Sequence, residues 1–532
     1  MLGEASAEPR SDAMSERYDA VVIGGGHNGL VAATYLARGG LRVLVLERRD
    51  LVGGACVTEE LFPGYRLSSC SYICHLLQEK VIVDLELPRH GFEVYALEPA
   101  RFHPFPDGRH LVIWDDHERT AAGIERYSRH DAAAYLRWMD LWEQAARLLH
   151  PFFLAPAPTY AELAAHVRGS DDEALFETLL TRPMWDLVHE HFESDVLRAH
   201  TLNAQDLGDP RAPGSALVYA YIKVNLRSAP GTVGIVKGGM GTITQAMARA
   251  AGEAGVEIRT GVDVARVHVV RGRAAGVVLP DGEVIGAGVV VSNADPKRTF
   301  LRLAPPGALP EEFRAQVARL STRASYFKFH AALRELPDFS RHLGSGFDPR
   351  YLAQVKICPS ADAFLAAWRD AQAGRPPHHP LMEVQIPSVY DPTLAPAGHH
   401  VVSVWALWAP VRLAEGAWET RRQEVGERLI DILTGYAPNF RRALADWMLL
   451  TPADLEARVG LTDGNIRHLD IVPAQMFARR PLPGWARYRT PLAGLYLCGA
   501  GTYPGGEVTG APGHNAAQAI LQDLLQGIAA GD

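Results

Sequence analysis

The chain has few cysteines, and their spacing argues against both disulfide redox chemistry and a zinc site. Only five occur in 532 residues. No two form a CxxC pair, so neither a redox disulfide nor a zinc site is indicated, and we expect no metal. A small odd number of thiols fits a reducing compartment, and we expect a cytoplasmic protein. The five are Cys56, Cys70, Cys74, Cys358 and Cys498.

Long apolar runs and excess positive charge are also missing. No stretch of 18 apolar residues occurs, so no membrane-spanning helix is predicted, although peripheral membrane contact stays open. Residues 1–17 contain no apolar segment and are expected to be a disordered tail rather than a secretory signal. The net charge of -8 argues against nucleic acid as a partner.

The most informative feature present is a glycine-rich turn between a predicted strand and a predicted helix, in residues 18–31. Gly24 permits the tight turn, Gly26 lets the backbone approach a pyrophosphate, and Gly29 lets helix and strand pack closely. Glu47 closes the next predicted strand, where a carboxylate accepts hydrogen bonds from ribose hydroxyls. The spacing predicts dinucleotide binding, and the alternative is a structural glycine turn.

A second glycine pair, Gly53 and Gly54, follows shortly after this acid. It resembles the extension found in FAD enzymes of the glutathione-reductase-like superfamily, amine-oxidase branch, where the backbone packs against the ribityl-diphosphate part of FAD. The alternative is an ordinary turn. No second GxGxxG follows a strand elsewhere, so a separate NAD(P)H domain is not indicated.

The order of predicted elements indicates an α/β protein: an FAD-binding Rossmann domain assembled from three segments, with an inserted α+β substrate-binding domain. The FAD-binding segments are 18–75, 231–300 and 465–532, and the inserts are 76–230 and 301–464. The first insert reads as helical and aromatic-rich. The second is expected to combine strands near 326–330 and 401–407 with helices near 361–372 and 421–436.

Several motifs, in this order, resemble those of the phytoene-desaturase-related FAD oxidoreductases. The chain is most similar to the subgroup called pyridine nucleotide-disulfide oxidoreductase domain-containing protein 2, although it lacks the cysteine pair that this name implies. The motifs are Gly24-Gly-Gly-His-Asn-Gly-Leu-Val-Ala-Ala33, the pair at 53–54, Gly238-Gly-Met-Gly241, Ser292-Asn-Ala-Asp-Pro296, Asp391-Pro-Thr-Leu-Ala-Pro396, and the glycine-rich run from Cys498 to Gly513.

The resemblance implies FAD held non-covalently, with the isoalloxazine between the two domains. Val264 lies where such enzymes bind adenine through backbone groups, and Gly499 and Val508 belong to the region that reaches the flavin. Relatives commonly carry His in place of Tyr503 and Gly in place of Glu507, which suggests a retuned pocket. The residues implied to touch the ADP and ribityl parts are Gly24, Gly26, Asn28, Gly29, Glu47, Arg48, Gly53, Gly54 and Ala55.

Three residues are candidates for catalysis: Lys328, Glu507 and Tyr503. In amine-oxidase relatives a lysine on the strand corresponding to that of Lys328 reaches flavin N5 through a water. Strand alternation places Tyr326, Lys328 and His330 on one face, and the alternative is a solvent-exposed edge lysine. Glu507 could accept a proton, anchor a cationic or hydroxylated substrate, or cap the following helix.

The sequence therefore predicts an FAD-dependent oxidoreductase of the dehydrogenase or desaturase type. Hydride would pass from an apolar or amphipathic organic substrate to flavin N5, and oxygen or a quinone would reoxidise the flavin. Two alternatives stay open: a redox-neutral flavoprotein isomerase, and a non-enzymatic prenyl- or lipid-binding protein of the same fold.

Overall fold

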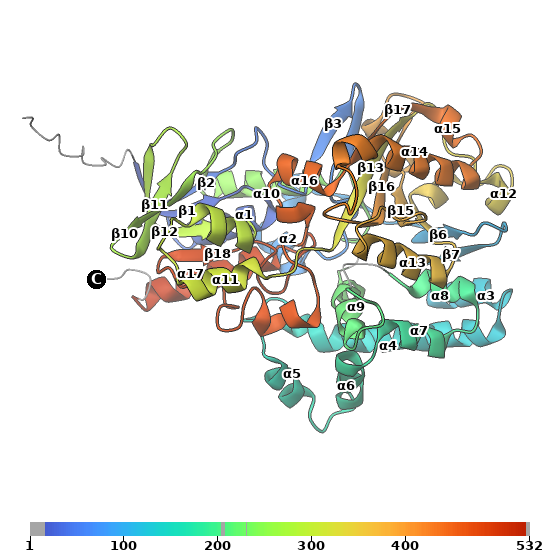
Figure 1. Ribbon diagram of the computed structural model, residues 1–532, viewed down its shortest axis with the longest axis horizontal. Coiled ribbons are helices and arrows are strands. Elements are labelled where there is room, and N and C mark those ends of the chain that lie inside the picture. The colour runs from blue at the N-terminus through green and yellow to red at the C-terminus, as the bar shows by residue number, and fades with distance from the viewer. Residues whose placement is uncertain (1–15, 204–207, 230, 528–532) are drawn as a thin grey trace, which may run out of the picture.

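The computed structural model describes residues 16–203, 208–229 and 231–527. It contains two large sheets, one toward each end of the molecule, and a layer of helices below the second sheet (Figure 1). The predicted tail at 1–17 lies mostly outside the described residues. The first strand, β1 (Glu16–Ile23), already includes Glu16 and Arg17, so the tail prediction is wrong for these two residues.

The first sheet has a parallel centre and an antiparallel flap. Strand β12 pairs in parallel with β1 on one side and with β18 on the other, while its first half also pairs antiparallel with β11. Strand β2 pairs in parallel with β1, and β9 with β2. The other strands are β2 (Val43–Leu46), β9 (Glu257–Arg259), β10 (Arg266–Val270), β11 (Arg273–Val278), β12 (Val284–Ser292) and β18 (Leu495–Leu497).

Strand β1 shows why both faces of this sheet are covered. Ala20 and Val22 lie in one apolar cluster, and Val21 and Ile23 lie in another on the opposite face. An apolar run buried on both sides is typical of a parallel strand between two helical layers. Helices α1 (His27–Arg38), α10 (Gly241–Glu253) and α17 (Ala511–Leu525) lie on the same side as one another, and α11 (Glu311–Ala318) packs on the other face.

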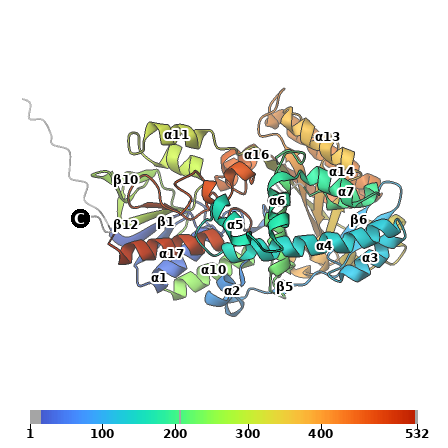
Figure 2. The ribbon, with the colours of Figure 1, turned by 90° about the horizontal axis from the view of Figure 1, so that it is seen from below.

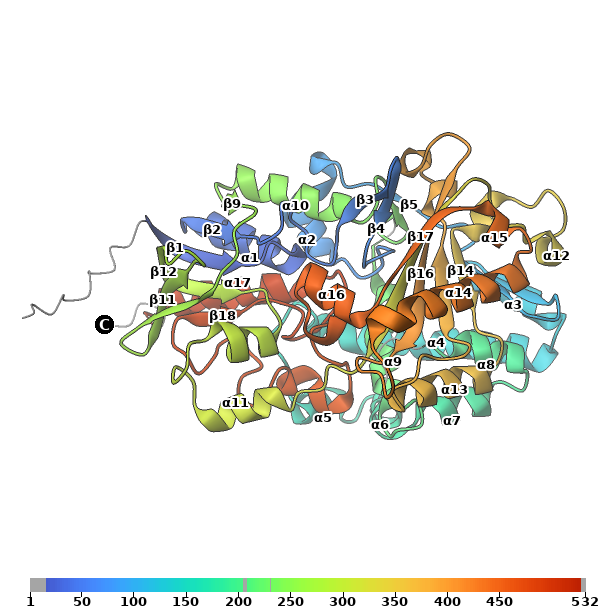
Figure 3. The ribbon, with the colours of Figure 1, turned by 45° about the horizontal axis from the view of Figure 1, so that its top comes forward.

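The second sheet has the order β17-β13-β16-β15-β14-β6-β7 and is antiparallel except for the β14–β6 pair. Its outer face carries α14 (Trp418–Tyr436), visible in Figure 3. The strands are β6 (Arg101–Pro104), β7 (His110–Ile113), β13 (Ser325–Leu333), β14 (Gln354–Ile357), β15 (Leu381–Gln385), β16 (His400–Ala409) and β17 (Leu444–Leu450), with helices α12 (Ser340–Leu343), α13 (Ala361–Gln372) and α15 (Phe440–Ala443) beside them.

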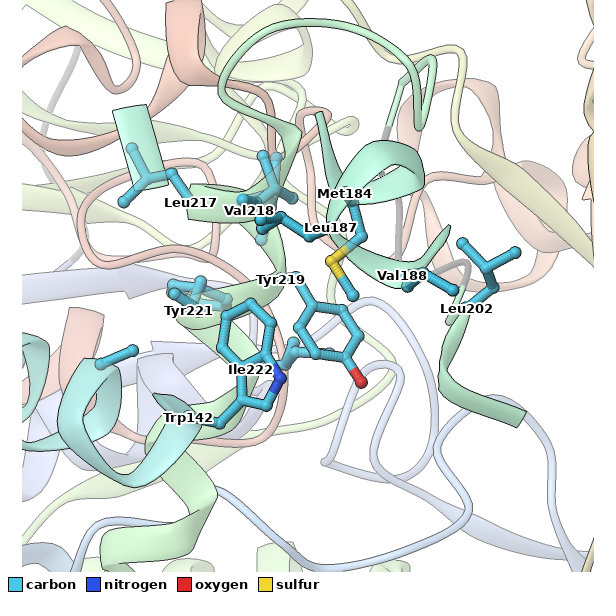
Figure 4. Packing of buried hydrophobic residues seen from close by; sticks show 14 of the residues in the cluster. Trp142, Met184, Leu187, Val188, Leu202, Leu217, Val218, Tyr219, Tyr221 and Ile222 are labelled. Atoms are coloured by element: carbon cyan, nitrogen blue, oxygen red, sulfur yellow. The ribbon is translucent and has the colours of Figure 1, made fainter. Parts of the chain in front are cut away.

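The helical layer lies along the inner face of this sheet (Figure 2). It packs around aromatic side chains: the Trp142 and Tyr219 rings meet edge to face at 4.6 Å between centroids (Figure 4). The helices are α3 (His117–Glu125), α4 (Arg129–Leu149), α5 (Tyr160–Val167), α6 (Glu173–Thr181), α7 (Met184–His191), α8 (Asp195–Thr201) and α9 (Ser215–Lys223). The α/β class and the helical, aromatic-rich first insert are confirmed.

The chain crosses between the two halves more often than the expected division implies. Strands β6 and β7 of the first insert complete the second sheet, as expected of two inserts that form one domain, but α11 of the second insert packs on the first sheet. The hairpin β3 (Thr58–Phe62) and β4 (Tyr65–Ser68) comes from the first FAD-binding segment but packs on β16. The smaller elements are α2 (Glu79–Asp84), β5 (Val94–Tyr95), β8 (Ile235–Val236) and α16 (Pro452–Val459).

Candidate cofactor and substrate site

A solvent-open cleft of about 860 Å³ lies at the carboxyl ends of β1, β2 and β12. The first glycine turn forms its floor, with Gly24 at φ +96°. A Cβ added at Gly26 would come 2.8 Å from Nδ2 of Asn293 and lies next to the backbone of Gly53. Glycine is therefore required here to keep the backbone low and the cleft open.

Glu47 is fixed at the end of β2 by two backbone groups. Its Oε2 accepts a hydrogen bond from the N–H of Gly25 at 2.9 Å, and its Oε1 accepts one from the N–H of Arg49 at 2.9 Å. The residue is 6% exposed and lines the cleft. Each carboxylate oxygen keeps a further lone pair for a ribose hydroxyl.

The second glycine pair abuts the first turn. The N–H of Gly53 donates to the carbonyl of Gly25 at 2.8 Å, and both glycines of the pair have positive φ, +130° at Gly53 and +58° at Gly54. The two turns thus form one wall of exposed backbone. The side-chain oxygen Oδ1 of Asn28 is buried beside it and has no hydrogen-bond partner among the described residues.

Two helix N-termini meet at this wall. A Cβ added at Gly513 of α17 would lie 2.2 Å from the carbonyl oxygen of Asn28 in α1, so the helices touch backbone to backbone. A Cβ at Gly29 would likewise lie 2.2 Å from the carbonyl oxygen of Gly24. Of the two helices, α1 begins at the cleft with no side-chain cap, so its positive dipole end favours an anion there and the glycine cradle fits a pyrophosphate.

The structure brings most of the predicted cofactor residues together. Gly29 and Gly499 do not line the cleft: Gly29 supports the turn from below, and Gly499 lies where β18 ends, with a Cβ there 2.7 Å from the carbonyl of Asn293. Val508 lines the neighbouring cavity. The cleft is lined by Gly24, Gly26, Asn28, Glu47, Arg48, Gly53, Gly54, Ala55 and Val264.

Sequence reasoning missed several lining residues. Asn293 donates through Nδ2 to the carbonyl of Gly24 at 3.2 Å and so ties β12 to the glycine turn. It lies in the quoted Ser292–Pro296 motif, which was the signal that could have found it. Gly460, just after α16, comes from the second insert, and Arg48 donates to the carbonyl of Ala457 at 3.0 Å.

A second cavity of about 540 Å³ adjoins the cleft, and His27, Ala55 and Ile466 line both. Its walls come from widely separated parts of the chain. Tyr72 and Trp405 form an aromatic side, with ring centroids 5.6 Å apart. Burial lowers the pKa of His27 to about 4, with a further contribution from His468, so its imidazole is neutral near pH 7.

Lys328 lies behind this aromatic wall. It is fully buried in β13, between β16 and β17, so the edge-lysine alternative is wrong. Its Nζ lies 5.0 Å from the centroid of the Tyr72 ring and has no hydrogen-bond partner among the described residues. Burial lowers the pKa of the amine to about 7. Tyr326, Lys328 and His330 are all buried on the face opposite the one that packs on α14.

Glu507 lines the same cavity from the loop before α17. Its backbone φ is +70°, and its carboxylate accepts a hydrogen bond from the buried guanidinium of Arg467. Burial alone would raise the pKa of this carboxyl, but Arg467 outweighs it and the pKa lies below the usual glutamate value. The capping alternative is wrong, because Gly510 is the N-cap of α17 and no side chain caps it.

The structure does not bring Tyr503 to either cavity. Its hydroxyl donates to the carbonyl of Phe152 at 2.9 Å, and its ring packs near Phe477, at 6.1 Å between centroids. The ring therefore points into the contact between the C-terminal loop and the helical layer. Burial raises the pKa of the phenol well above its usual value.

A third cavity, about 1,860 Å³ and open to solvent, adjoins the second and shares Tyr72, Ile73 and His75 with it. It lies between the inner face of the second sheet and helices α4 and α9. Its lining mixes aromatic residues, such as Tyr135 and Trp138, with cations. The cleft and the two cavities thus adjoin one another in series and share lining residues.

The cysteines give no support to disulfide chemistry. All five are free and buried. Cys56 and Cys70 lie at the second cavity, where burial raises the pKa of Cys56 to about 12 and that of Cys70 to about 11. Thiols held protonated in this way are poor nucleophiles.

A dinucleotide cleft with two further cavities in series beside it is the arrangement of a nucleotide-cofactor enzyme, and the comparisons identify which kind. The family model described as flavin containing amine oxidoreductase matches residues 29–444. The chain belongs to this family, and its cofactor is FAD. In the described part of the chain, no helix combines the length and apolar character that crossing a bilayer requires.

Several curated proteins are similar to this chain over nearly its whole length. The chain is 36% identical to the mouse protein called pyridine nucleotide-disulfide oxidoreductase domain-containing protein 2, over 96% of this chain and 94% of that one (Mus musculus). It is 29% identical to a limonene dehydrogenase component of Castellaniella defragrans, over 95% of each chain. It is 25% identical to the lycopene-forming phytoene desaturase of Pantoea ananas, over 95% and 99%. The predicted family resemblance is confirmed.

Solved structures show the same fold at lower identity. A redesigned putrescine oxidase superposes with a TM-score of 0.63 at 16% identity, covering 96% of this chain and 99% of that one. Cyclohexylamine oxidase from Brevibacterium oxydans superposes with a TM-score of 0.59 at 18% identity, with the same coverage of each chain. These matches confirm the predicted FAD-binding fold of the amine-oxidase branch.

Proposed function

We propose that this protein is an FAD-dependent oxidoreductase that removes hydride from an apolar or amphipathic organic substrate. The observation that carries the proposal is the adjacency of three spaces that share lining residues: the dinucleotide cleft, the cavity lined by Tyr72 and Trp405, and the larger cavity beneath the second sheet. Bound FAD supplies the hydride acceptor, at flavin N5, and the protein supplies position, charge and exclusion of water.

The first glycine turn, the second glycine pair and Glu47 hold the ADP part in this account. Glu47 accepts hydrogen bonds from ribose hydroxyls, and the N-terminus of α1 faces the pyrophosphate. Val264 contributes backbone groups near the adenine.

Lys328 is the residue we propose for proton handling, acting from behind the Tyr72 side of the second cavity. Its amine has a pKa of about 7, so it holds and releases a proton at Nζ near neutral pH. The surroundings of Tyr72 and Trp405 keep bulk water away from it. Glu507 suits a different role: a carboxylate held ionised by Arg467 is a weak base, and we propose that it fixes the shape and charge of the cavity wall.

The names of two relatives favour an apolar substrate, since limonene and phytoene are hydrocarbons. The aromatic lining of the third cavity supports the same class. Oxygen or a quinone is the electron acceptor that we propose. We also propose that the protein is cytoplasmic. Peripheral contact with a membrane would then let a poorly soluble substrate reach the cavity.

Anaerobic mixing of the FAD-loaded protein with a panel of carotenoids, apolar lipids and amines tests the proposal. Bleaching of the flavin absorbance, together with a product that has lost two hydrogens, is the expected result. A product isomeric with its substrate and no net oxidation would favour the isomerase instead. Lipid binding by a protein that takes up no FAD would favour the non-enzymatic alternative.

A further inference from the structure

The third cavity has one feature that a hydrocarbon substrate does not use: cationic side chains gather at one part of its wall. Arg101 of β6 and Lys223 of α9 both line it. Lys356 of β14 lies behind them, fully buried, with its Nζ donating to the carbonyls of His200 at 2.7 Å and Leu202 at 2.6 Å. Arg101 and Lys356 both act electrostatically on Lys223, so the three charges form one group.

Acidic residues do not neutralise this group. Glu383 is buried behind Arg101, with 3.5 Å between carboxylate and guanidinium, and balances one of the three charges. Glu143 also lines the cavity, but its carboxylate accepts a hydrogen bond from Arg227 at 2.7 Å. Asp115 lies at the rim and is exposed to solvent, which screens it.

Lys223 is the member of the group without an anionic partner. No hydrogen bond or ion pair joins its amine to any described residue, and its Nζ lies 5.1 Å from the centroid of the Tyr219 ring. Burial lowers the pKa of the amine to about 8, helped by Arg101 and Lys356, so it still carries its charge at neutral pH. A partly buried ammonium without a counter-ion is costly unless a ligand pairs with it.

The rest of the cavity is suited to an apolar chain or ring. Tyr135, Trp138 and Ile222 line it, and each is less than 10% exposed. Tyr72 and His75 lie at its junction with the second cavity, on the side toward Lys328. A ligand held by the cations therefore extends along aromatic surface toward the cavity in which we place the reaction.

We infer that the substrate is an amphipathic organic anion, with an apolar body and a carboxylate that pairs with Lys223 and Arg101. The inference rests on the proposed function, because it assumes that hydride leaves the part of the molecule next to the Lys328 cavity. The same charges repel alkylammonium ions, so the site disfavours the amines that the names of the solved neighbours suggest.

Binding to the FAD-loaded protein tests this without requiring turnover. Submicellar dodecanoate, dodecanol and dodecylamine share one apolar chain and differ in head-group charge, and dodecyl phosphate separates a phosphate from a carboxylate. Tryptophan fluorescence reports binding, since Trp114 and Trp138 line the cavity. The variants are Lys223→Met, Lys223→Arg, and Lys80→Met, which alters a surface lysine paired with Asp84.

Dodecanoate is expected to bind more tightly than dodecanol, and dodecylamine least. Lys223→Met should weaken dodecanoate by roughly tenfold or more and leave dodecanol unchanged, because one charge-assisted contact is lost. Lys223→Arg should restore most of the affinity, and Lys80→Met should bind as the parent does. Tighter binding of dodecyl phosphate than of dodecanoate would overturn the choice of carboxylate.

Equal affinity for acid, alcohol and amine would overturn the inference, as would failure of both anions to bind or an unchanged affinity in Lys223→Met. The proposed function fails on different results. A protein without flavin absorbance would contradict the oxidoreductase while the anion-binding data still stood. A protein that holds FAD but ignores head-group charge would contradict only the anionic substrate.

Discussion

Glu47 is a single side chain at the cleft whose role in holding FAD no neighbouring residue can take over. Glu47→Ala removes the carboxylate that two backbone N–H groups hold in place. We expect FAD affinity to fall by roughly 10- to 100-fold, which corresponds to the loss of about 1–3 kcal/mol in charge-assisted hydrogen bonds. Titration of the flavin-free protein with FAD measures this. Glu125→Ala, on the exposed face of α3, is the control, and equal affinities in both variants would contradict the assignment.

Lys328 should matter to the rate and not to cofactor retention. Lys328→Met keeps most of the buried volume of the side chain and removes the amine that lies over Tyr72. We expect flavin reduction or reoxidation to slow while the FAD content stays normal, because the residue lies outside the dinucleotide cleft. Stopped-flow measurement of the two half-reactions checks this. Parent-like rates in both would leave the buried amine without a catalytic role.

Glu507 is expected to show its role in stability and in its dependence on pH. Its pKa is lower in the folded chain than the ordinary value, so its pairing with Arg467 stabilises the fold above the ordinary glutamate pKa. That contribution is lost as pH falls through the folded-state pKa. Glu507→Gln should therefore unfold at lower urea than the parent at pH 7, and the difference should shrink in acid. A difference that is constant with pH would show that charge is not the cause.

At the scale of elements, alternation and glycine placement predicted more than composition did. The helices expected near 361–372 and 421–436 correspond to α13 and α14, and the strands expected near 326–330 and 401–407 lie within β13 and β16. The first glycine turn could be predicted because each of its glycines is required by a local steric constraint. Strands β6 and β7 were missed, since each is only four residues long and pairs with a sheet built from residues far along the chain.

The contact between the N-termini of α1 and α17 supports the cofactor cradle. A substitution at this contact between helices tests its role. Gly513→Ala places a methyl group against the carbonyl of Asn28 and forces the two helices apart. We expect a loss of roughly 1–3 kcal/mol in stability and weaker FAD binding, as overpacking at a tight contact does. Urea unfolding and FAD titration measure the two effects.

The matched control is Gly252→Ala in α10, where an added methyl group meets nothing within 4 Å. Alanine in place of a helical glycine should raise stability by about 0.5–1 kcal/mol and leave FAD affinity unchanged. If both alanine variants behaved alike, the close approach of α1 and α17 would not be what holds the cofactor cradle in place.

Considered as a whole, the molecule forms its site from parts that the sequence separates by hundreds of residues. The dinucleotide motif was predictable because its residues all lie within one short stretch of sequence, 24–55. Tyr72, Trp405 and Arg467 were not, since only the packing of the second sheet against the first brings them to one cavity. Tyr503 shows the opposite error: a residue in the right loop, whose side chain turns to the helical layer.

The central claim is that segments far apart in the sequence form one FAD cleft, and the flavin stoichiometry of the purified protein tests it most directly. The chain is saturated with FAD, freed of excess cofactor, and denatured, and the released flavin is measured against protein concentration. The account predicts one FAD per chain for the parent and strongly depleted flavin for Gly26→Val, whose side chain would collide with the Asn293 amide that is hydrogen-bonded to the glycine turn. A parent protein without bound flavin, or a Gly26→Val variant with a full complement, would contradict it.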